Sequence, residues 1–226
     1  MRHEPVALAS GLKLPPSAVA DALRADARAA TAPTMPALQR YTGVLFQSLS
    51  PATLSAAAVA RAEEQVIVVS GLWGPVRAGD LVPDYRVPAA GNVPGLGGVT
   101  AHWRGPLAEE MADTVGDHAI LDLRSTDYRG MWTPRDAERV VTVRVVAERA
   151  PARRGAAGVR SQVSFQAKTV KGLVLRHLVS ASTRQEDPMM ALARAADAMD
   201  MWLEPDQMRA SRPGAPRSVD VVGRYP

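Results

Sequence analysis

The stretch from Val66 to Arg86 most constrains how this chain folds. It opens with Val66–Val69, four β-branched residues without polar alternation, which predicts a strand covered on both faces. Ser70 and Gly71 end that strand, and the glycines and prolines that follow exclude a long regular element. The sequence therefore predicts a shaped loop at the end of a buried strand, which is where open α/β sheets bind their ligands.

Six side chains of this loop carry polar or aromatic groups that suit a ligand site. They are Ser70, Trp73, Arg77, Asp80, Tyr85 and Arg86. Loops placed on a rigid scaffold often hold binding residues. A purely structural interpretation is equally open, in which Trp73 fills the core and Arg77 forms an internal ion pair with Asp80.

Composition narrows the classes of protein and of site. The chain has 226 residues, of which 46% are hydrophobic and 22% charged, as in a single globular domain. It has no cysteine, which excludes disulfides, thiolate nucleophiles and iron–sulfur ligation and fits a cytoplasmic protein. It has no run of about 18 apolar residues, so no membrane partner is expected. The net charge of +4 permits a polyanionic partner.

Residues 7–30 are predicted to form two helices joined by a tight turn. The first helix covers Ala7–Leu12, and Ser17 is the expected N-cap of the second, Ala18–Ala30. The outline resembles the helix-hairpin-helix, which offers backbone N–H groups to a DNA phosphate without reading bases. An ordinary helical hairpin is an equally open interpretation, because Leu14-Pro15-Pro16 replaces the usual Gly-hydrophobe-Gly turn and removes two donors.

The rest of the chain alternates strands and helices, which predicts an α/β fold with a mixed β-sheet and flanking helices. Strands are expected over 39–46, 119–123, 140–146, 162–165 and 200–203, and helices over 50–65, 99–115, 167–179 and 189–199. Residues 162–165 should return antiparallel to 140–146, since about ten connecting residues favour a hairpin over a crossover. Residues 1–204 are expected to form one domain, and residues 205–226, rich in Pro, Arg, Ser and Gly, a disordered tail.

Five blocks of residues follow one another in an order and spacing shared with a known family. They are Arg40-Tyr41-Thr42-Gly43-Val44-Leu45, the Ser70–Arg86 loop, Pro94-Gly95-Leu96-Gly97 with Trp103, Asp122-Leu123-Arg124-Ser125 through Tyr128 and Trp132, and Ser164-Phe165-Gln166-Ala167-Lys168 with Lys171-Gly172. Together they resemble the YaaA peroxide-stress proteins of bacteria over residues 7–203.

The resemblance implies a cytoplasmic protein that protects cells from hydrogen peroxide by limiting free iron. No cofactor is expected. It also implies a mixed α/β fold with a helix-hairpin-helix, and sequence-nonspecific binding of duplex DNA. The family's hairpin corresponds to Leu12–Leu23 here, so the expected DNA contacts are Lys13, Ser17, Arg24 and Arg28. Family members usually begin with a buried strand before this hairpin, so the chain is expected to be an N-terminally truncated member of reduced stability.

Basic residues near the predicted strand ends form a second candidate site. Lys168 and Lys171 open a helix, where the helix dipole favours an anion, although a solvated helix end is also open. Asp122 and Arg124 are expected to pair internally or to orient a ligand. The full set proposed for a small anionic, nucleotide-like ligand is Arg40, Thr42, Ser70, Trp73, Arg77, Asp80, Tyr85, Arg86, Asp122, Arg124, Lys168 and Lys171.

Signals for catalysis are absent from the sequence. The four histidines share no metal-ligand spacing, and Ser70-Gly71 lacks the pattern of a nucleophile elbow, so no catalytic or metal-binding residue is assigned. The sequence therefore favours a non-enzymatic, DNA-binding protein of oxidative stress. The alternatives are an enzyme or binding protein for the small anion, and an inactive truncated member of the family.

Overall fold

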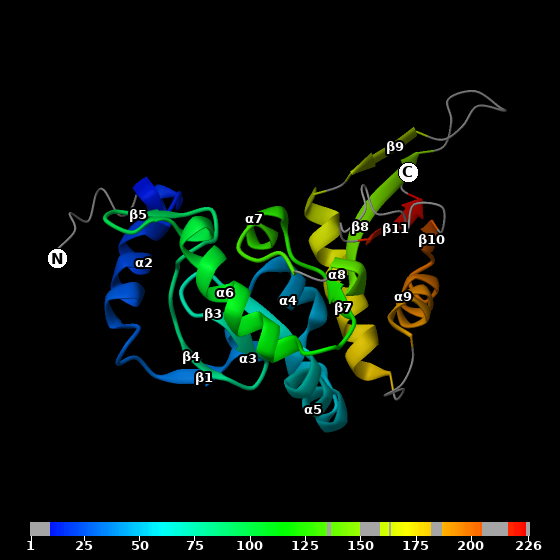
Figure 1. The fold of residues 1–226 in the computed structure, drawn as a ribbon, viewed down its shortest axis with the longest axis horizontal. Coiled ribbons are helices and arrows are strands. Elements are labelled where there is room, and N and C mark those ends of the chain that lie inside the picture. The colour runs from blue at the N-terminus through cyan, green and yellow to red at the C-terminus, as the bar shows by residue number, and fades with distance from the viewer. Residues whose placement is uncertain are drawn as a thin grey trace. The chain divides into compact units, whose positions relative to one another are not determined.

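A computed structural model describes residues 10–134, 137–149, 159–162, 164–181, 187–204 and 217–224 (Figure 1). The chain divides into two compact units, and each is described by itself. The first unit comprises Met1–Tyr41, Ala62–Gly116 and Arg124–Pro134, and the second comprises Thr42–Arg61, Asp117–Leu123 and Arg135–Pro226. A single domain over residues 1–204 stays a prediction.

In its described residues, the first unit combines helices with three two-stranded ribbons. Its helices are α2 (Pro16–Arg28), α3 (Ala37–Arg40), α6 (Val99–Val115) and α7 (Thr126–Arg129). The ribbons are antiparallel and join β1 (Thr34–Pro36) to β4 (Leu81–Pro83), β2 (Ile67–Ser70) to β3 (Gly74–Arg77), and β5 (Asn92–Val93) to β6 (Gly97–Gly98). The helix predicted over 99–115 is confirmed as α6.

Strand β2 forms where a strand was predicted, but the expected coverage of both its faces is wrong. Among the described strands β2 pairs with β3 alone, and its first three residues are only half-buried. Gly74 makes this tight hairpin possible, because its φ of 70° is accessible to glycine and a Cβ there would lie 2.7 Å from the Trp103 ring. The apolar run therefore serves a local hairpin and not a central parallel strand.

The second unit is built on a mixed sheet, which confirms the predicted α/β class. Its described strands are β7 (Ile120–Asp122), β8 (Val140–Arg149), β9 (Val159–Gln162), β10 (Trp202–Glu204) and β11 (Arg217–Arg224). The order is β10-β11-β8-β7, with β7 and β11 parallel to β8 and β10 antiparallel to β11. Strand β9 returns antiparallel along β8, as the short connection predicts. The bounds predicted for it, 162–165, are wrong, because β9 covers Val159–Gln162 and α8 (Ser164–Ser180) begins at Ser164.

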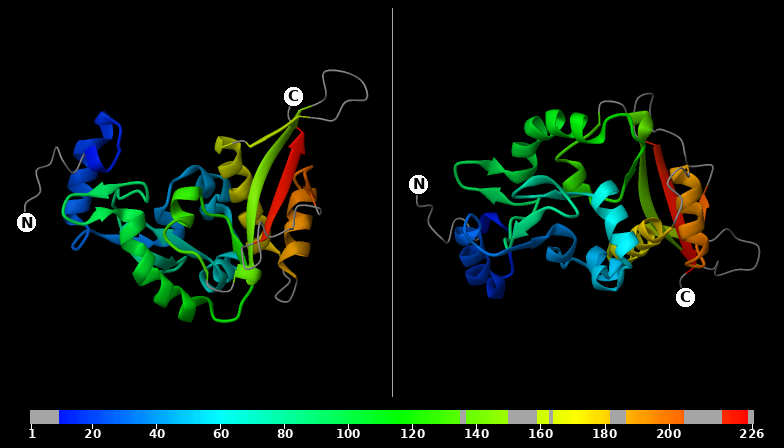
Figure 2. Two further views of the ribbon diagram at one scale, coloured as in Figure 1. Left: turned by 45° about the horizontal axis from the view of Figure 1, so that its top comes forward. Right: turned by 90° about the horizontal axis from the view of Figure 1, so that it is seen from below.

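Strand β11 contradicts, over residues 217–224, the disordered tail predicted for residues 205–226, whose other residues lie outside the described ranges. Residues 217–224 pair with β8 along their full length, as Figure 2 shows, and with β10 on the other side. Val219, Val221 and Val222 are completely buried. The prediction failed because the Pro, Arg, Ser and Gly content of the whole segment hid one short valine-rich run.

Valines from neighbouring strands fill the core of the second unit. Residues 141, 143 and 145 of β8 and residues 219 and 221 of β11 belong to one buried cluster. Helices α8 (Ser164–Ser180) and α9 (Pro188–Asp197) complete that cluster with Val174 and Leu192, both fully enclosed. Small aliphatic residues therefore do the packing that aromatic residues do in many proteins, consistent with an aromatic content of 4%.

The strand predicted over 39–46 is wrong. Residues 39 and 40 end α3, residues 41–43 form a non-helical connection, and residues 44–46 begin α4 (Val44–Leu49). Helical spacing brings Leu45 and Leu49 to one side of α4. Helix α4 packs so closely on α8 that a Cβ on Gly172 would lie 2.2 Å from the Leu45 carbonyl oxygen. Packing against α8 thus overrides the strand propensity of Val44 and its neighbours.

The helix predicted over 50–65 is interrupted. A 3₁₀ turn at Pro51–Thr53 precedes α5 (Ala56–Gln65). Arg176 of α8 donates to the Leu49 carbonyl at 2.8 Å and so satisfies a backbone acceptor at the end of α4.

None of the helices in the described ranges combines the length and apolar character that crossing a bilayer requires.

Candidate functional site

The N-terminal turn and α2 carry the four residues predicted to contact DNA. Lys13, Ser17, Arg24 and Arg28 are all exposed. Ser17, Arg24 and Arg28 share one face of α2 with Asp21, since these positions are spaced by three or four residues. Arg24 forms an exposed ion pair with Asp21. The structure thus places the predicted contacts in one row on the surface of the first unit.

Two prolines shape the turn before α2. The helix begins at Pro16, with Pro15 at the N-cap position, so the predicted N-cap at Ser17 is wrong. Proline is favoured at the first helical position, where its missing N–H would have no partner within the helix. Lys13 has a φ of 52°, which reverses the chain ahead of the helix. The helix predicted over 7–12 falls mainly outside the described residues, so a helix-hairpin-helix stays a prediction.

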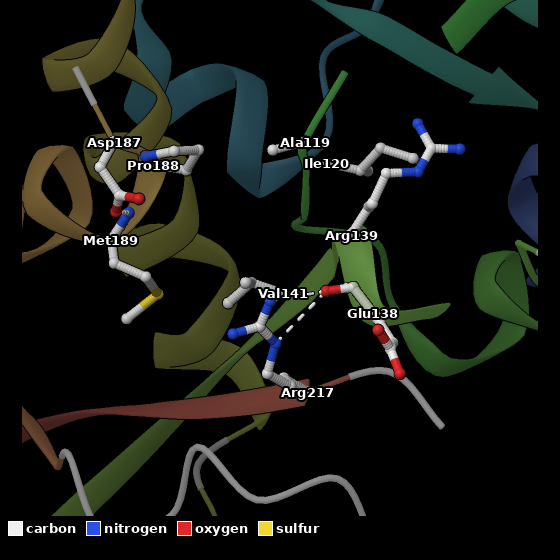
Figure 3. A pocket seen from close by; sticks show the side chains of 9 residues that line it. All are labelled: Ala119, Ile120, Glu138, Arg139, Val141, Asp187, Pro188, Met189 and Arg217. Carbon is white, nitrogen blue, oxygen red and sulfur yellow. Dashed lines mark hydrogen bonds between the residues drawn. The ribbon is translucent and has the colours of Figure 1, made fainter. Parts of the chain in front are cut away.

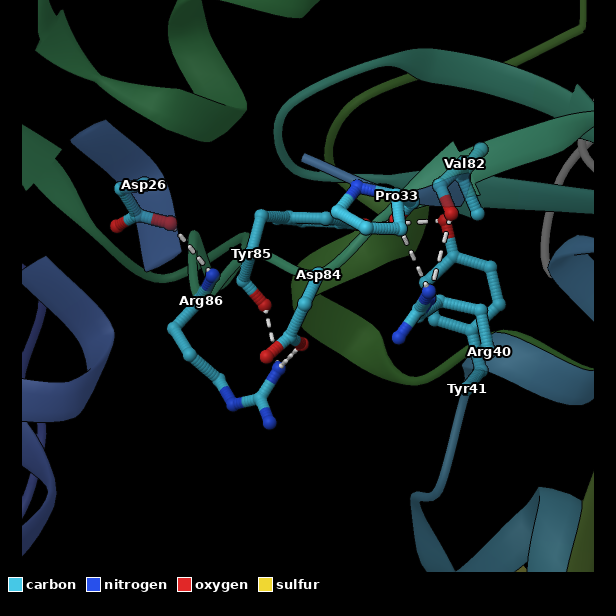
Figure 4. A network of polar contacts seen from close by, with 8 residues as sticks. All are labelled: Asp26, Pro33, Arg40, Tyr41, Val82, Asp84, Tyr85 and Arg86. Carbon is cyan, nitrogen blue, oxygen red and sulfur yellow. Dashed lines mark hydrogen bonds and ion pairs between the residues drawn. The ribbon is translucent and has the colours of Figure 1, made fainter. Parts of the chain in front are cut away.

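Asp26 fixes another side of α2 to the loop after β4. Its Oδ1 accepts from the backbone N–H of Arg86 at 2.6 Å, as Figure 4 shows. Its Oδ2 is buried and accepts no hydrogen bond from the described residues. Burial raises the pKa of Asp26, and outweighs the hydrogen bond and the charge of Arg86, which lower it. The attachment of α2 therefore involves a carboxylate that is unfavourable to ionise.

Asp26 should make the folded protein less stable as the pH rises. Because its pKa is raised in the folded state, its favourable contribution is complete below the ordinary value of 3.8 and is lost as the pH rises through the raised value. Asp26→Asn keeps an oxygen for Arg86 and has no charge to bury. Its free energy of unfolding, measured by urea denaturation, should therefore increase relative to wild type between about pH 3 and pH 7.

Asp21→Asn is the matched control, since it removes one acidic charge from an exposed position on the same helix. A difference between Asp26→Asn and wild type that shrinks as the pH rises would contradict the raised pKa of Asp26.

A chain of hydroxyl groups closes the loop that follows β2. Ser70 Oγ lies 2.5 Å from Tyr85 Oη, and Tyr85 donates to Tyr41 Oη at 3.0 Å. Ser70 Oγ also accepts the N–H groups of Leu72 and Trp73, at 3.1 and 2.9 Å. Since Tyr85 gives its proton to Tyr41, Ser70 donates to Tyr85. The three hydroxyls therefore form a directed hydrogen-bond chain.

This hydroxyl chain anchors the loop and does not provide a nucleophile. Ser70 is 1% exposed, so a substrate has no access to its Oγ. Burial raises the pKa of Tyr85, which keeps the phenol neutral and able to donate. The Tyr41 and Tyr85 rings also meet edge to face, with centroids 6.3 Å apart. Tyr41 is absent from the predicted site residues, although it stands in the first block that resembles the YaaA family.

Two of the predicted ligand-binding arginines bind backbone carbonyl groups within the first unit. Arg40 donates through Nε to the Val82 carbonyl at 3.2 Å and through Nη2 to that of Pro33 at 3.4 Å (Figure 4). Arg124 donates to the Trp132 carbonyl at 3.1 Å, and its guanidinium carbon lies 5.2 Å from the centre of the Trp132 ring. Arg40 thus joins α3 to β4, and Arg124 joins the residues on either side of α7.

The remaining loop residues also make local contacts. The Asp80 carboxylate accepts from the backbone N–H of Arg77 at 2.7 Å, which closes the turn after β3. The Arg86 side chain pairs with Asp84. Trp73 is 39% exposed, so the suggestion that it fills the core is wrong. The indole that packs inside this loop is Trp103, which donates to the Gly71 carbonyl at 2.9 Å.

Four of the predicted anion-site residues lie in the second unit. They are Thr42, Asp122, Lys168 and Lys171. Asp122 ends β7 and is 5% exposed, and Lys171 on α8 is 9% exposed, whereas Thr42 and Lys168 are exposed. Gly172, next to Lys171, allows the backbone of α4 to approach α8 closely. The twelve residues divide between the units, eight to four, so a shared ligand site stays a prediction.

A cavity of about 360 Å³ lies in the second unit where β7, β8 and β11 begin (Figure 3). Apolar groups such as Val141 and Met189 line it together with Arg139, Arg217 and Asp187. These charged groups already bind backbone. Arg217 Nη2 donates to the Glu138 carbonyl at 2.7 Å, Arg139 donates to that of His118 at 3.2 Å, and Asp187 accepts from the Met189 N–H at 2.7 Å. No predicted ligand residue lines this cavity.

From the sequence, no residue is assigned to a metal site. Within the part of the chain that the structure describes, no three His, Asp or Glu side chains gather closely enough to hold a metal ion.

Comparison with known proteins identifies the family. The sequence model described as "Peroxide stress protein YaaA" matches residues 3–197. A UPF0246 protein of Streptomyces coelicolor is 40% identical over 195 residues, covering 85% of this chain and 70% of the relative. A UPF0246 protein of Corynebacterium efficiens is 35% identical over 204 residues, covering 87% of this chain and 77% of the relative. The chain therefore belongs to the YaaA family of peroxide stress proteins.

Proposed function

We propose that this protein acts in the response to hydrogen peroxide by binding duplex DNA through its phosphate backbone, and so helps to limit free iron. The observation that carries the proposal is the exposed row of Ser17, Arg24 and Arg28 on α2, next to the turn that holds Lys13. Membership of the peroxide stress family supports the physiological role. The DNA contact itself rests on the chemistry of this surface.

The groups in this row suit phosphate better than base edges. Guanidinium and ammonium groups on long side chains bind phosphate oxygens, and a serine hydroxyl is a common additional donor. Arg24 is paired with Asp21 in an exposed ion pair, which contributes little free energy, so Arg24 can exchange Asp21 for a phosphate at small cost. Such contacts bind DNA without sequence preference.

The proposed effect on iron is indirect. The described residues contain no cluster of three metal ligands, and the chain contains no cysteine. In this proposal the effect on iron follows from the DNA contact. A variant that no longer binds DNA should therefore also lose its protection against peroxide.

Charge reversal on α2 tests the DNA contact. Arg24→Glu combined with Arg28→Glu should weaken binding to a mixed-sequence duplex by at least about 25-fold at 0.15 M salt, since each lost phosphate contact costs about fivefold there. The dissociation constants can be measured by fluorescence anisotropy. Both side chains are exposed, so folding should not suffer.

The matched control is Arg77→Glu with Arg104→Glu, which makes the same change in net charge at two other exposed positions of the first unit. The proposal predicts a much smaller loss for this control. Equal losses in the two double variants would mean that general charge, and not α2, governs binding.

A further inference from the structure

We propose that the β5–β6 hairpin is a second DNA-contacting element, whose tip residue Leu96 enters the minor groove beside the phosphates bound by the N-terminal turn. This inference rests on the proposed DNA binding. It extends the DNA contact to a hairpin of the first unit that contains none of the predicted DNA-binding residues. It depends on three features of the hairpin: its position, the shape of its turn, and the chemistry of its tip.

The hairpin lies directly against the N-terminal turn. A Cβ on Gly11 would lie 1.9 Å from the carbonyl oxygen of Asn92, so the two backbones are in contact. The next residue, Leu12, is 1% exposed, and its Cδ2 lies 3.4 Å from where a Cβ on Gly91 would be. Figures 1 and 2 both show the hairpin beside the start of α2. A duplex on the N-terminal turn would therefore meet the hairpin as well.

The turn of the hairpin projects one apolar side chain. Leu96 donates its N–H to the Val93 carbonyl at 3.0 Å, and Pro94-Gly95 occupies the two central positions, with a φ of 79° at Gly95. Gly97 follows with a φ of 87°, and a Cβ there would meet no atom within 4 Å. Leu96 is consequently 51% exposed between two glycines that leave room for a partner to approach.

The chemistry of the tip fits the minor groove of DNA. Proteins that bind there insert apolar side chains such as leucine between base steps and use asparagine to reach acceptors on the base edges. The hairpin offers Leu96 and the exposed Asn92, and residues 91–98 contain no acidic side chain to repel phosphates. The exposed ammonium group of Lys13 on the adjoining turn is complementary to the phosphates beside the groove. An apolar partner would require a larger patch than this one leucine.

Leu96→Ser tests the inference, with Leu81→Ser as the matched control. Leu81 is 66% exposed on β4 of the same unit, so both substitutions remove an exposed leucine without opening a core cavity. Leu96→Ser should weaken binding of the full chain to an A·T-rich duplex about tenfold, as expected for losing a partly buried leucine contact. It should leave the slope of log affinity against log salt unchanged, because no charge is lost. Leu81→Ser should bind like wild type.

The possible outcomes separate this inference from the proposed function. If wild type binds DNA, the Arg24/Arg28 variant binds weakly and Leu96→Ser binds normally, the second contact is overturned and the α2 contact stands. If Leu96→Ser weakens binding and also makes the slope of log affinity against log salt smaller, the loss is electrostatic and the apolar contact is overturned. If wild type has no affinity for the duplex, both proposals fall together.

Discussion

Arg144→Met should lower the free energy of unfolding by about 3–5 kcal/mol, because it leaves a buried carboxylate without its partner. Arg144 on β8 and Asp220 on β11 lie opposite each other in the parallel register, and Arg144 Nε contacts Asp220 Oδ1 at 2.6 Å. The Asp220 side chain is only 6% exposed, so water cannot replace the guanidinium. Urea denaturation of the variant and of wild type gives the difference directly.

A second substitution shows whether the loss comes from the stranded charge. Asp220→Val in the Arg144→Met background removes the carboxylate and restores apolar packing between two strands that are otherwise rich in valine. The double variant should recover most of the lost stability, since apolar replacements of buried ion pairs are often neutral. A loss below about 1 kcal/mol in the single variant would mean that the pair contributes little.

Gly172→Ala should also destabilise the protein strongly, by about 3 kcal/mol or more. In a helix this change normally gains about 1 kcal/mol, so packing must outweigh propensity. The new Cβ would lie 2.2 Å from the Leu45 carbonyl oxygen and 2.7 Å from Ser48 Cβ, which forces α4 and α8 apart. The hydrogen bond from Arg176 to the Leu49 carbonyl would then weaken as well.

Gly43→Ala is the matched control for this prediction. Gly43 is the N-cap of α4, has a φ of −61°, and a Cβ there would meet no atom within 4 Å. A less favourable cap and a less flexible unfolded chain act in opposite directions, so stability should change by less than about 1 kcal/mol. Thermal unfolding distinguishes the two glycines. Similar effects at both positions would show that close packing of α4 on α8 is not the cause.

The sequence predicts elements well where one periodic pattern decides the outcome. Residues 99–115 and 167–179 form helices, and residues 140–146 form a strand, as expected. Prediction fails where distant contacts decide. Residues 44–46 become helical because α8 offers a glycine for close packing of α4, and β11 gains its stability from β8, which lies far away in the chain. Neither partner is visible in the local sequence.

The candidate site shows the same limit. The resemblance to the family indicates the residues of the exposed row on α2, and helical spacing then places them on one face. It does not identify Asp26, whose partner Arg86 is sixty residues away, or Tyr41, which reaches Tyr85 only in the folded unit. Several arginines predicted to bind a ligand, such as Arg40 and Arg124, bind backbone carbonyl groups instead of presenting a solvated charge. A list of polar residues cannot separate these two uses.

The most direct test of the account is the salt dependence of duplex binding by wild type and by the Arg24→Glu, Arg28→Glu variant. Wild type should bind two unrelated sequences of the same A·T content equally, with affinity that falls steeply as salt increases. The slope of log affinity against log salt should be smaller by about 2 in the variant, one unit for each lost phosphate contact. Equal slopes in the two proteins, or a wild-type affinity that does not respond to salt, would contradict a phosphate-binding surface on α2.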